Sequence, residues 1–445
     1  MQNSISRFSA DLVIEASWVI PIEPHGVVLE NHAVAIAGGT ITAVLPREEM
    51  RTRCSSGQTC RLDSHVLIPG LINFHSHAAM TLMRGLADDL KLMDWLSNHI
   101  WPAESKHVSA QFTYDGTLHA CAEMLCGGIT CFNDMYFFPE MTAKAALDAG
   151  MRAALGIISI EFPTAYASDA QDYLRKGLAM RDELKHEALL SFCMAPHAPY
   201  TVSDKSFEQI LTLSEQLQIP INTHLHETLD EIRESLAKYG VRPLARLEKL
   251  GMLGPNFIAV HAVHLEPAEI DLLARLGCSV AHCPSSNLKL ASGMAPVDRM
   301  LSAGINIGIG TDGAASNNRL DVFCEMRLAA LLAKATSGNA EILPAHTALR
   351  MATLNAAQAL GLERRIGSIQ SGKCADLCAV NLESIALSPC YDPASHLVYT
   401  AGREDVSDVW VAGRQLVGSG RLLHLDEGGI MHKAREWRSR IAGSM

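Results

Sequence analysis

Two histidines stand one residue apart at the end of an apolar run, LIPGLINFHSH, at residues 67–77. Residues i and i+2 of a β-strand face the same side, so His75 and His77 can direct both imidazoles at one metal ion. Two imidazoles do not complete a coordination shell. The other ligands must come from elsewhere in the chain, and their identity decides which chemistry the site could perform.

Ligand-type residues recur where later apolar runs end, at His197, His224, His261, His282 and Asp312. A single histidine in such a place is commonly a core or capping residue, but this repetition along one chain favours a shared site. Three imidazoles and one carboxylate bind Zn²⁺ or Fe²⁺ at catalytic sites that keep one position open for water. The predicted ligands are His75, His77, His224 and Asp312.

The candidate proton carrier is Glu227, which lies three residues after His224 in the segment INTHLHE. A carboxylate beside an activated water can accept its proton and deliver it to a substrate nitrogen. Two of the candidate residues also have a structural alternative. Glu227 could stabilise the first turn of a helix, and Asp312 could cap the helix that follows it.

Four further histidines are interpreted from their place in the pattern. His261 ends its apolar run in AVHAVHL, so we expect it rather than His264 to act on the water at the metal site. His226 should face away from the site if the strand continues through it. His282 could instead support a loop that shapes the pocket.

Elements that could position these side chains alternate along the middle of the chain. Helix-length amphipathic segments at 111–127, 204–217, 266–276 and 321–334 separate short apolar runs at 66–74, 129–133, 151–160, 189–196, 219–225, 256–261, 278–282 and 304–311. Eight βα units close naturally into a parallel barrel, whose active site lies where the strands end.

The two ends of the chain have a different sequence pattern. Short strands separated by turns fill residues 10–66, and similar segments return at 367–380 and 408–414. We therefore predict an α/β fold with three parts. Residues 1–66 form the first part of a β-sandwich, 67–366 form a (β/α)₈ barrel of the TIM type, and 367–445 complete the sandwich and add a C-terminal helix.

Composition excludes several classes of partner. The chain of 445 residues carries a formal charge of −11, which disfavours nucleic acid and anionic membranes. No stretch approaches the ~20 apolar residues of a membrane span, and the N-terminus does not resemble a secretory signal, so a cytoplasmic location is expected. Twelve scattered cysteines form no C-x-x-C pair and are expected to be reduced.

Together these motifs resemble the amidohydrolase superfamily and, within it, the 5′-methylthioadenosine/S-adenosylhomocysteine deaminases. The resemblance covers nearly the whole chain, including TLNAAQALGL at 353–362. It is carried by FHSHAAMTLMRGLADDLKLMDWL, HIWPAE, APHAPYTVSD, THLHET, AVHAVHL, HCPSSNLKL and GIGTDGAASNN. Binuclear relatives take a modified lysine from the fourth strand, but here LLSFCMAPHAPY offers His197 and no lysine, so a mononuclear centre is expected.

The resemblance also implies roles for individual residues. It places one zinc ion on the four predicted ligands and assigns acid and base work to Glu227. It implies that Glu104 binds the ribose hydroxyls, that Trp95 packs on the nucleoside and that His197 contacts the substrate. A carboxylate can accept hydrogen bonds from two adjacent hydroxyls. As alternatives, Trp95 could be an ordinary core residue and Glu104 a solvated surface acid.

The implied reaction is hydrolytic deamination at C6 of an adenine ring, giving an inosine-type product and ammonia. Asp312 and His261 would help to generate and aim the hydroxide, while Glu227 protonates the ring nitrogen. Fe²⁺ and Mn²⁺ fit the same ligands as Zn²⁺. A small-molecule nucleoside is the expected partner, and a homodimer or higher homo-oligomer is expected by resemblance alone.

One segment departs from the family pattern. Members that accept S-adenosylhomocysteine bind its charged tail with arginines beyond the third strand, whereas EFPTAYASDAQDYLR at 161–175 carries Glu161, Asp169 and Asp172 before Arg175. The segment therefore favours 5′-methylthioadenosine over S-adenosylhomocysteine. Rival functions are a guanine or 8-oxoguanine deaminase, a triazine hydrolase, and a non-catalytic barrel that has kept the metal.

Overall fold

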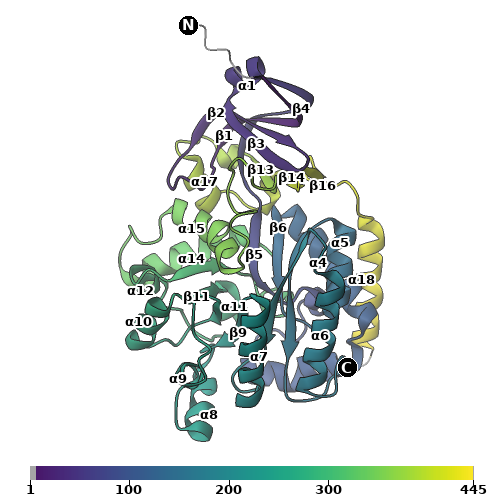
Figure 1. Ribbon diagram of the computed structural model, residues 1–445, viewed down its shortest axis with the longest axis vertical. Coiled ribbons are helices and arrows are strands. Elements are labelled where there is room, and N and C mark those ends of the chain that lie inside the picture. Colours follow the sequence, from purple (N-terminus) through teal and green to yellow (C-terminus); the bar gives the residue numbers. More distant parts are fainter. Residues whose placement is uncertain (1–6, 444–445) are drawn as a thin grey trace.

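The computed structural model describes residues 7–443 and confirms the predicted barrel (Figure 1). Eight parallel strands pair in chain order, and the amide of Asp312 donates to the carbonyl of His75 across 2.9 Å where the last strand meets the first. The strands are β5 (Leu71–Ser76), β6 (Ile129–Asp134), β7 (Arg152–Ser159), β8 (Leu190–Pro196), β9 (Ile221–Leu225), β10 (Phe257–His261), β11 (Ser279–His282) and β12 (Asn306–Ile309).

Helices follow the barrel strands and cover their outer face. They are α4 (Ala110–Cys126), α5 (Pro139–Ala149), α6 (Ala170–Leu184), α7 (Asp204–Leu217), α8 (Leu229–Tyr239), α9 (Pro243–Lys249), α10 (Pro267–Leu276), α11 (Pro284–Lys289), α12 (Val297–Ser302), α13 (Ala314–Asn317), α14 (Val322–Ser337), α15 (Ala345–Met351) and α16 (Leu354–Ala359). Short polar side chains cap several of them: Ser109 accepts from the amide of Phe112, and Asp169 accepts from that of Asp172.

Between β5 and α4 the chain makes a long excursion over the barrel mouth. It contains four short elements: η1 (Ala78–Met83), α2 (Leu92–Trp95), η2 (Leu96–Ile100) and α3 (Trp101–His107). A cluster of apolar side chains packs beneath it, among them Met83, Trp95 and Phe112. The excursion supplies one wall of the candidate substrate site.

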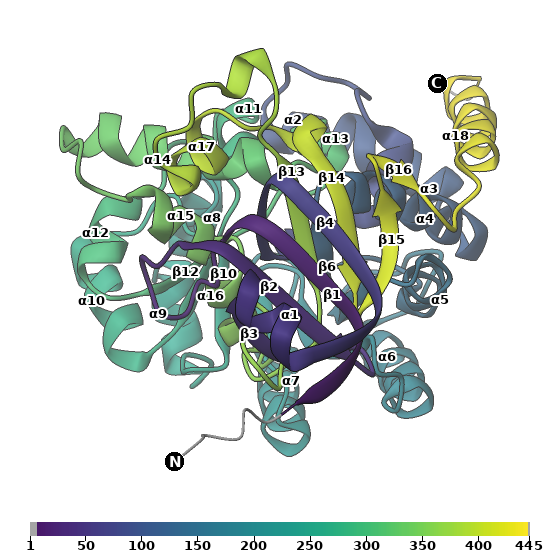
Figure 2. The ribbon, with the colours of Figure 1, turned by 90° about the horizontal axis from the view of Figure 1, so that it is seen from above.

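The predicted β domain from both chain ends is also confirmed (Figure 2). Its strands form one mixed sheet in the order β16-β15-β14-β13-β4-β1-β2-β3, and β4 joins the two ends by pairing with β13 from Pro69↔Leu377 to His65↔Asn381. The strands are β1 (Phe8–Val19), β2 (Leu29–Ala37), β3 (Thr40–Pro46), β4 (Cys54–Pro69), β13 (Leu377–Asn381), β14 (Val406–Val411), β15 (Arg414–Gly418) and β16 (Arg421–Leu422), with α1 (Arg47–Arg53) between β3 and β4.

A close connection joins this sheet to the barrel. Gly70 separates β4 from β5, and a Cβ atom there would lie 2.1 Å from the Thr130 hydroxyl, so only glycine fits. The amide of Gly70 donates to the carbonyl of Asp376, and the Asp376 carboxylate forms a buried ion pair with Arg152 at the start of β7.

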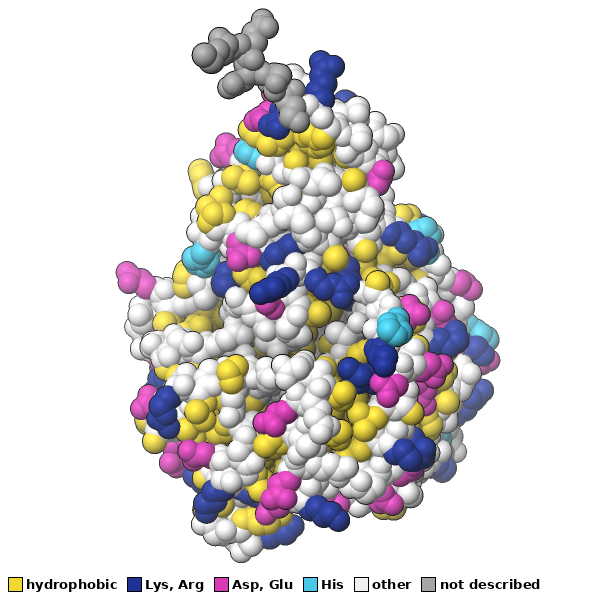
Figure 3. Space-filling view, viewed as in Figure 1, with side chains coloured by type: hydrophobic (Ala, Val, Ile, Leu, Met, Phe, Trp, Pro, Cys, Tyr) yellow, Lys and Arg dark blue, Asp and Glu magenta, His cyan; other side chains and the backbone are white. Residues whose placement is uncertain are grey.

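The C-terminal segments return to the barrel. Helix α17 (Pro393–Tyr399) packs near α15, and α18 (Glu427–Ala442) packs along α4, where Trp437 meets Phe112 edge to face and donates to Asp115. All twelve cysteines are free thiols. Acidic and basic side chains are interspersed on the face drawn in Figure 3. Over residues 7–443, no helix has both the length and the apolarity to cross a bilayer.

Candidate metal centre and substrate cavity

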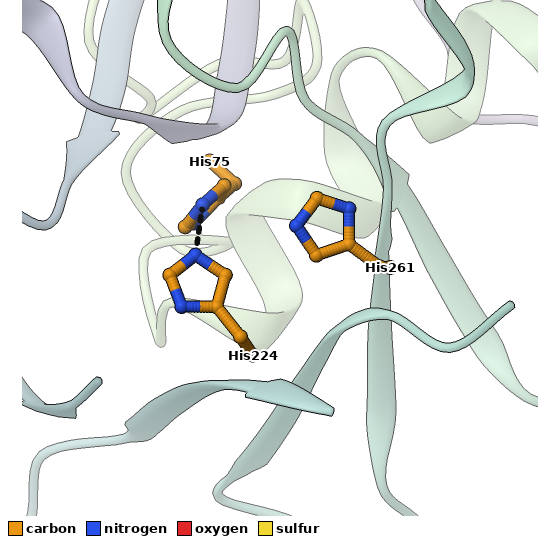
Figure 4. Close-up of side chains that lie close together, drawn as sticks. All are labelled: His75, His224 and His261. Atoms are coloured by element: carbon orange, nitrogen blue, oxygen red, sulfur yellow. Dashed lines mark hydrogen bonds between the residues drawn. The ribbon is translucent and has the colours of Figure 1, made fainter. Parts of the chain in front are cut away.

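Three of the four predicted ligands converge from opposite sides of the barrel mouth. His75 is fully buried near the end of β5, and its Nε2 lies 3.2 Å from Nε2 of His224 at the end of β9. Figure 4 shows these two rings meeting, with His261 beside them. Oδ1 of Asp312, after β12, lies 3.6 Å from Nε2 of His75.

The fourth predicted ligand completes the cluster. His77 follows β5 directly, and its Nε2 lies 3.2 Å from Oδ1 of Asp312. Two overlapping sets of side chains have the spacing of metal ligands: His75, His77 and Asp312, and His75, His224 and His261. The structure therefore brings all four predicted ligands together and adds His261 at the edge of the group.

Backbone carbonyls fix the orientation of two of these imidazoles. Nδ1 of His77 lies 2.5 Å from the carbonyl oxygen of Met135, and Nδ1 of His224 lies 2.7 Å from that of His197. An Nδ1–H that donates to a carbonyl leaves the lone pair on Nε2, which is the usual arrangement in metal-binding histidines. Both Nε2 atoms face the cluster.

The two oxygens of the Asp312 carboxylate have different surroundings. Ser286 and Ser316 donate to Oδ2 across 2.6 and 2.7 Å, whereas Oδ1 is buried and has no hydrogen-bond partner in the described part of the chain. A buried carboxylate oxygen without a partner costs free energy, which a bound cation offsets. The donor set of three imidazoles and one carboxylate therefore fits a divalent ion.

The protonation of the cluster also suits a cation. Burial and neighbouring histidines hold the pKa values of His75 and His224 well below the usual range, so both rings are neutral, as ligands must be. Burial lowers the pKa of His77, but the Asp312 carboxylate 3.2 Å from Nε2, together with the Met135 carbonyl and Asp134, outweighs burial and raises the pKa to about 9. The Asp312 carboxylate therefore favours positive charge at this place, which either a proton on His77 or a bound cation supplies.

The two predicted proton-handling residues lie beside the cluster. Glu227 follows β9 and is 7% exposed, and its Oε2 lies 3.8 Å from Nε2 of His261 at the end of β10. Burial raises the pKa of Glu227, which brings the carboxyl closer to the range in which it can exchange protons near neutral pH. Both side chains line the same cavity as His77 and Asp312.

This cavity of about 430 Å³ opens above the cluster and is large enough for a nucleoside. Glu104 from α3 lines it, and the hydroxyl of Tyr136 donates to the Glu104 carboxylate across 2.7 Å. Burial raises the pKa of Glu104 to about 7, although the bond from Tyr136 lowers it. Trp95 and His197 also line the cavity.

Other histidines from the sequence pattern face elsewhere. Nε2 of His226 accepts from the amide of Leu244 across 3.1 Å, and that of His264 donates to the carbonyl of Ser292 across 2.7 Å. Neither lines the cavity, whereas His261 does. His282 is buried at the end of β11, the strand beside the one that ends in His261, and lines a small separate cavity.

The acidic segment after β7 turns its charges away from the cavity. The Glu161 carboxylate accepts from Ser206, Asp169 caps α6, and Asp172 pairs with Arg175 across 2.5 Å. Among the described residues that line the cavity, none is Lys or Arg. Its outer part is instead apolar, with Trp101 and Phe162 in edge contact at 6.3 Å between ring centres.

Several site residues carried no signal in the sequence. Tyr136 reaches Glu104 from the loop after β6, and Ser286 and Ser316 reach Asp312 from α11 and α13. Serine and tyrosine are common in loops, so their types alone identify nothing. Asp134, which ends β6, accepts from the amide of Ala78 and so supports the turn after His77; its position at a strand end was the one available indication.

Comparison with known proteins places the fold and site in a family. The model of the amidohydrolase family matches residues 66–416. A 5-methylthioadenosine/S-adenosylhomocysteine deaminase from Saccharophagus degradans is 46% identical over 436 residues, which make up 98% of each chain.

Solved structures agree with the sequence match. A zinc-bound adenosine deaminase from Xanthomonas campestris is 48% identical, with a TM-score of 0.97 over 98% of this chain and 100% of its own. A zinc complex of atrazine chlorohydrolase from Arthrobacter aurescens is 26% identical, with a TM-score of 0.88 over 96% of this chain and 100% of its own. The chain therefore belongs to the amidohydrolase family and, within it, to the 5-methylthioadenosine/S-adenosylhomocysteine deaminases.

Proposed function

We propose that this protein hydrolyses the C6 amine of 5′-methylthioadenosine, releasing ammonia and an inosine-type product. The observation that carries the proposal is that one cavity holds two carboxylates with different surroundings. Glu227 lies beside the His/Asp cluster, whereas Glu104 lies on the α3 wall and is hydrogen-bonded to Tyr136. Glu227 is placed for proton transfer to a purine ring, and Glu104 is placed to bind the two hydroxyls of a ribose.

A divalent ion, with zinc as the first candidate, would be held by His75, His77, His224 and Asp312 and would activate water at neutral pH. Glu227 then takes a proton from the water and delivers one to ring nitrogen N1. This transfer makes C6 electrophilic. The water oxygen adds to C6 while Nε2 of His261 accepts a hydrogen bond from it. The remaining hydroxyl proton then passes through Glu227 to the amine nitrogen, the C–N bond breaks as the C6 carbonyl forms, and ammonia leaves.

Glu104 supplies recognition of the sugar. Adjacent 2′- and 3′-hydroxyls present two donors, and a carboxylate has two acceptor oxygens to meet them. One Glu104 oxygen is oriented by Tyr136, which holds the carboxylate toward the cavity. A free base such as guanine, or a triazine, has no diol and gains nothing from this residue.

The outer part of the cavity supports the apolar substrate. A methylthio group buries favourably against Trp101, Phe162 and Ile160. The charged tail of S-adenosylhomocysteine would meet these side chains without a lysine or arginine among the described residues that line the cavity, because Arg175 is paired with Asp172. Burying a charge without a partner is costly. We therefore infer a preference for 5′-methylthioadenosine.

Glu227→Gln tests the assignment of this chemistry. The amide keeps the size of the side chain but cannot shuttle a proton, so we expect ammonia release from 5′-methylthioadenosine to fall by roughly 10²- to 10⁴-fold. Metal content should stay at the wild-type level. Full activity in Glu227→Gln would remove Glu227 from the mechanism, and a wild-type enzyme that releases no ammonia from any nucleoside would favour a non-catalytic barrel.

A further inference from the structure

A second layer of polar side chains lies behind His261. Nδ1 of His261 is 2.8 Å from Oδ1 of Asn287, which belongs to α11. Both residues are only 1% exposed, so water from the main cavity does not compete for this contact. Asn287 does not line the substrate cavity, so it can act there only through His261.

The contact selects one form of the imidazole. An amide oxygen accepts only, so Nδ1 of His261 must carry a hydrogen and donate it to Asn287. In the neutral ring, Nε2 then holds the lone pair. That nitrogen faces Glu227 at 3.8 Å and belongs to the group with His75 and His224. Through this contact, Asn287 causes His261 to present Nε2 as an acceptor to the candidate reaction centre.

The other end of the Asn287 side chain faces a second buried histidine. Its amide nitrogen is buried and has no partner in the described part of the chain, and the same holds for both ring nitrogens of His282. His282 is 3% exposed and ends β11, next to the strand that ends in His261. Each unpartnered buried polar group of this kind costs about 1–3 kcal/mol.

These polar atoms share a small cavity. Asn287 and His282 both line a space of about 10 Å³ that is separate from the substrate cavity, and apolar residues such as Val297 and Ala329 also line it. The volume is close to the lower limit for a single water molecule, which needs two or more polar partners. The amide nitrogen donates, and the imidazole can both donate and accept, so one water would satisfy them.

We propose that Asn287 is a positioning residue for His261, and that a single buried water held between the Asn287 amide and His282 fixes its orientation. The inference rests on the proposed deamination for its kinetic consequence. Its structural consequences, the tautomer of His261 and the buried water, do not depend on the deamination and can be observed directly.

The kinetic test compares two substitutions at one position in the zinc-loaded enzyme. Asn287→Asp keeps an acceptor oxygen, whereas Asn287→Leu removes it at similar size. We expect Asn287→Leu to lower kcat for 5′-methylthioadenosine by about 10- to 100-fold, the usual cost of losing such a supporting contact. KM should stay within about twofold, metal content should be unchanged, and Asn287→Asp should recover most of kcat.

The matched control is Asn306→Leu at the opposite end of the barrel. Asn306 donates to Ser279 and to the carbonyl of Asn355 and does not line the substrate cavity, so its loss should leave kcat near the wild-type value. Equal kcat in Asn287→Leu and Asn306→Leu would overturn the proposal. So would equal losses in Asn287→Leu and Asn287→Asp, which would indicate a merely structural role.

Two observations test the proposal without activity. Nitrogen-15 spectra of histidine-labelled holoenzyme, assigned with His261→Asn, should show hydrogen on Nδ1 of His261. A high-resolution crystal structure should show one water bonded to Asn287 and His282. Hydrogen on Nε2, or a dry cavity, would overturn the proposal. If the wild-type enzyme releases no ammonia from any nucleoside, the proposed function fails while these two measurements still decide the positioning role.

Discussion

Tyr136 donates its hydroxyl hydrogen to Glu104 across 2.7 Å, and this pair forms a polar patch on the α3 side of the cavity. Tyr136 is 4% exposed and comes from the loop after β6, whereas Glu104 comes from the excursion that precedes α4. A carboxylate held by a buried tyrosine has a defined direction. The pair can therefore distinguish a nucleoside from a free base.

Glu104→Gln should weaken nucleoside turnover selectively. The amide keeps one acceptor oxygen but loses the charge, and hydrogen bonds to charged groups are worth about 1.5–3 kcal/mol. We expect kcat/KM for 5′-methylthioadenosine to fall by roughly 10- to 150-fold, measured by ammonia release. Glu208→Gln, on the exposed face of α7, is the control and should match the wild type. Equal values in both variants would contradict sugar recognition by Glu104.

Binding of the nucleoside should depend on pH through the same residue. Burial raises the pKa of Glu104 to about 7, so the carboxylate is ionised above this value and protonated below it. The ionised form accepts both ribose hydroxyls, so KM should fall as pH rises through about 7. Glu104→Gln should lack this component when KM profiles are compared. A wild-type KM that rises with pH, or the same profile in both proteins, would contradict the assignment.

The ion pair between Arg152 and Asp376 should stabilise the junction of barrel and sheet. Both side chains are at most 5% exposed, and Nε of Arg152 lies 2.5 Å from the carboxylate. Asp376→Asn leaves a buried guanidinium without its counter-charge, and we expect the free energy of unfolding to fall by about 3–5 kcal/mol. The exposed pair Lys144–Asp148 is the control, and Asp148→Asn should cost less than about 1 kcal/mol. If urea unfolding showed similar losses of unfolding free energy in Asp376→Asn and Asp148→Asn, the buried ion pair would not stabilise the junction more than an exposed one.

Metal removal should affect stability and activity together. A bound ion stabilises the folded chain because the unfolded chain has no preformed site. Chelation should therefore lower Tm and abolish ammonia release, and added Zn²⁺ should restore both. His224→Ala should lose the zinc-dependent rise in Tm, whereas His264→Ala, outside the cluster, should keep it. A Tm that does not respond to chelation in the wild type would contradict a metal held by this cluster.

The barrel could be predicted from the sequence because its signal is periodic. Each apolar run ends in a strand terminus, and strand termini meet at one mouth, so His75, His224 and Asp312 could be grouped before any distance was known. The same reasoning separated His261 from His264, because only the first ends a strand. Regular elements carry side chains in predictable directions.

The positions of the loop residues could not be predicted from a periodic pattern in this way. Tyr136, Ser286 and Ser316 reach the site through the conformations of single loops and short helices, which depend on contacts across the whole barrel mouth. The positive φ angles of His261 and Asp312, 71° and 62°, are equally hidden in the sequence, although they help to turn these residues toward the centre. Trp95 lines the cavity, and its packing on a nucleoside stays a prediction.

The most direct test of the central claim is a comparison of ammonia release by the zinc-loaded enzyme from five substrates: 5′-methylthioadenosine, S-adenosylhomocysteine, adenosine, guanine and a triazine. We predict that 5′-methylthioadenosine has the highest kcat/KM, that S-adenosylhomocysteine is poorer because its charged tail meets the apolar outer cavity, and that guanine and the triazine release no ammonia. A higher kcat/KM for S-adenosylhomocysteine would contradict the inferred preference, and turnover of guanine or the triazine alone would contradict nucleoside deamination itself.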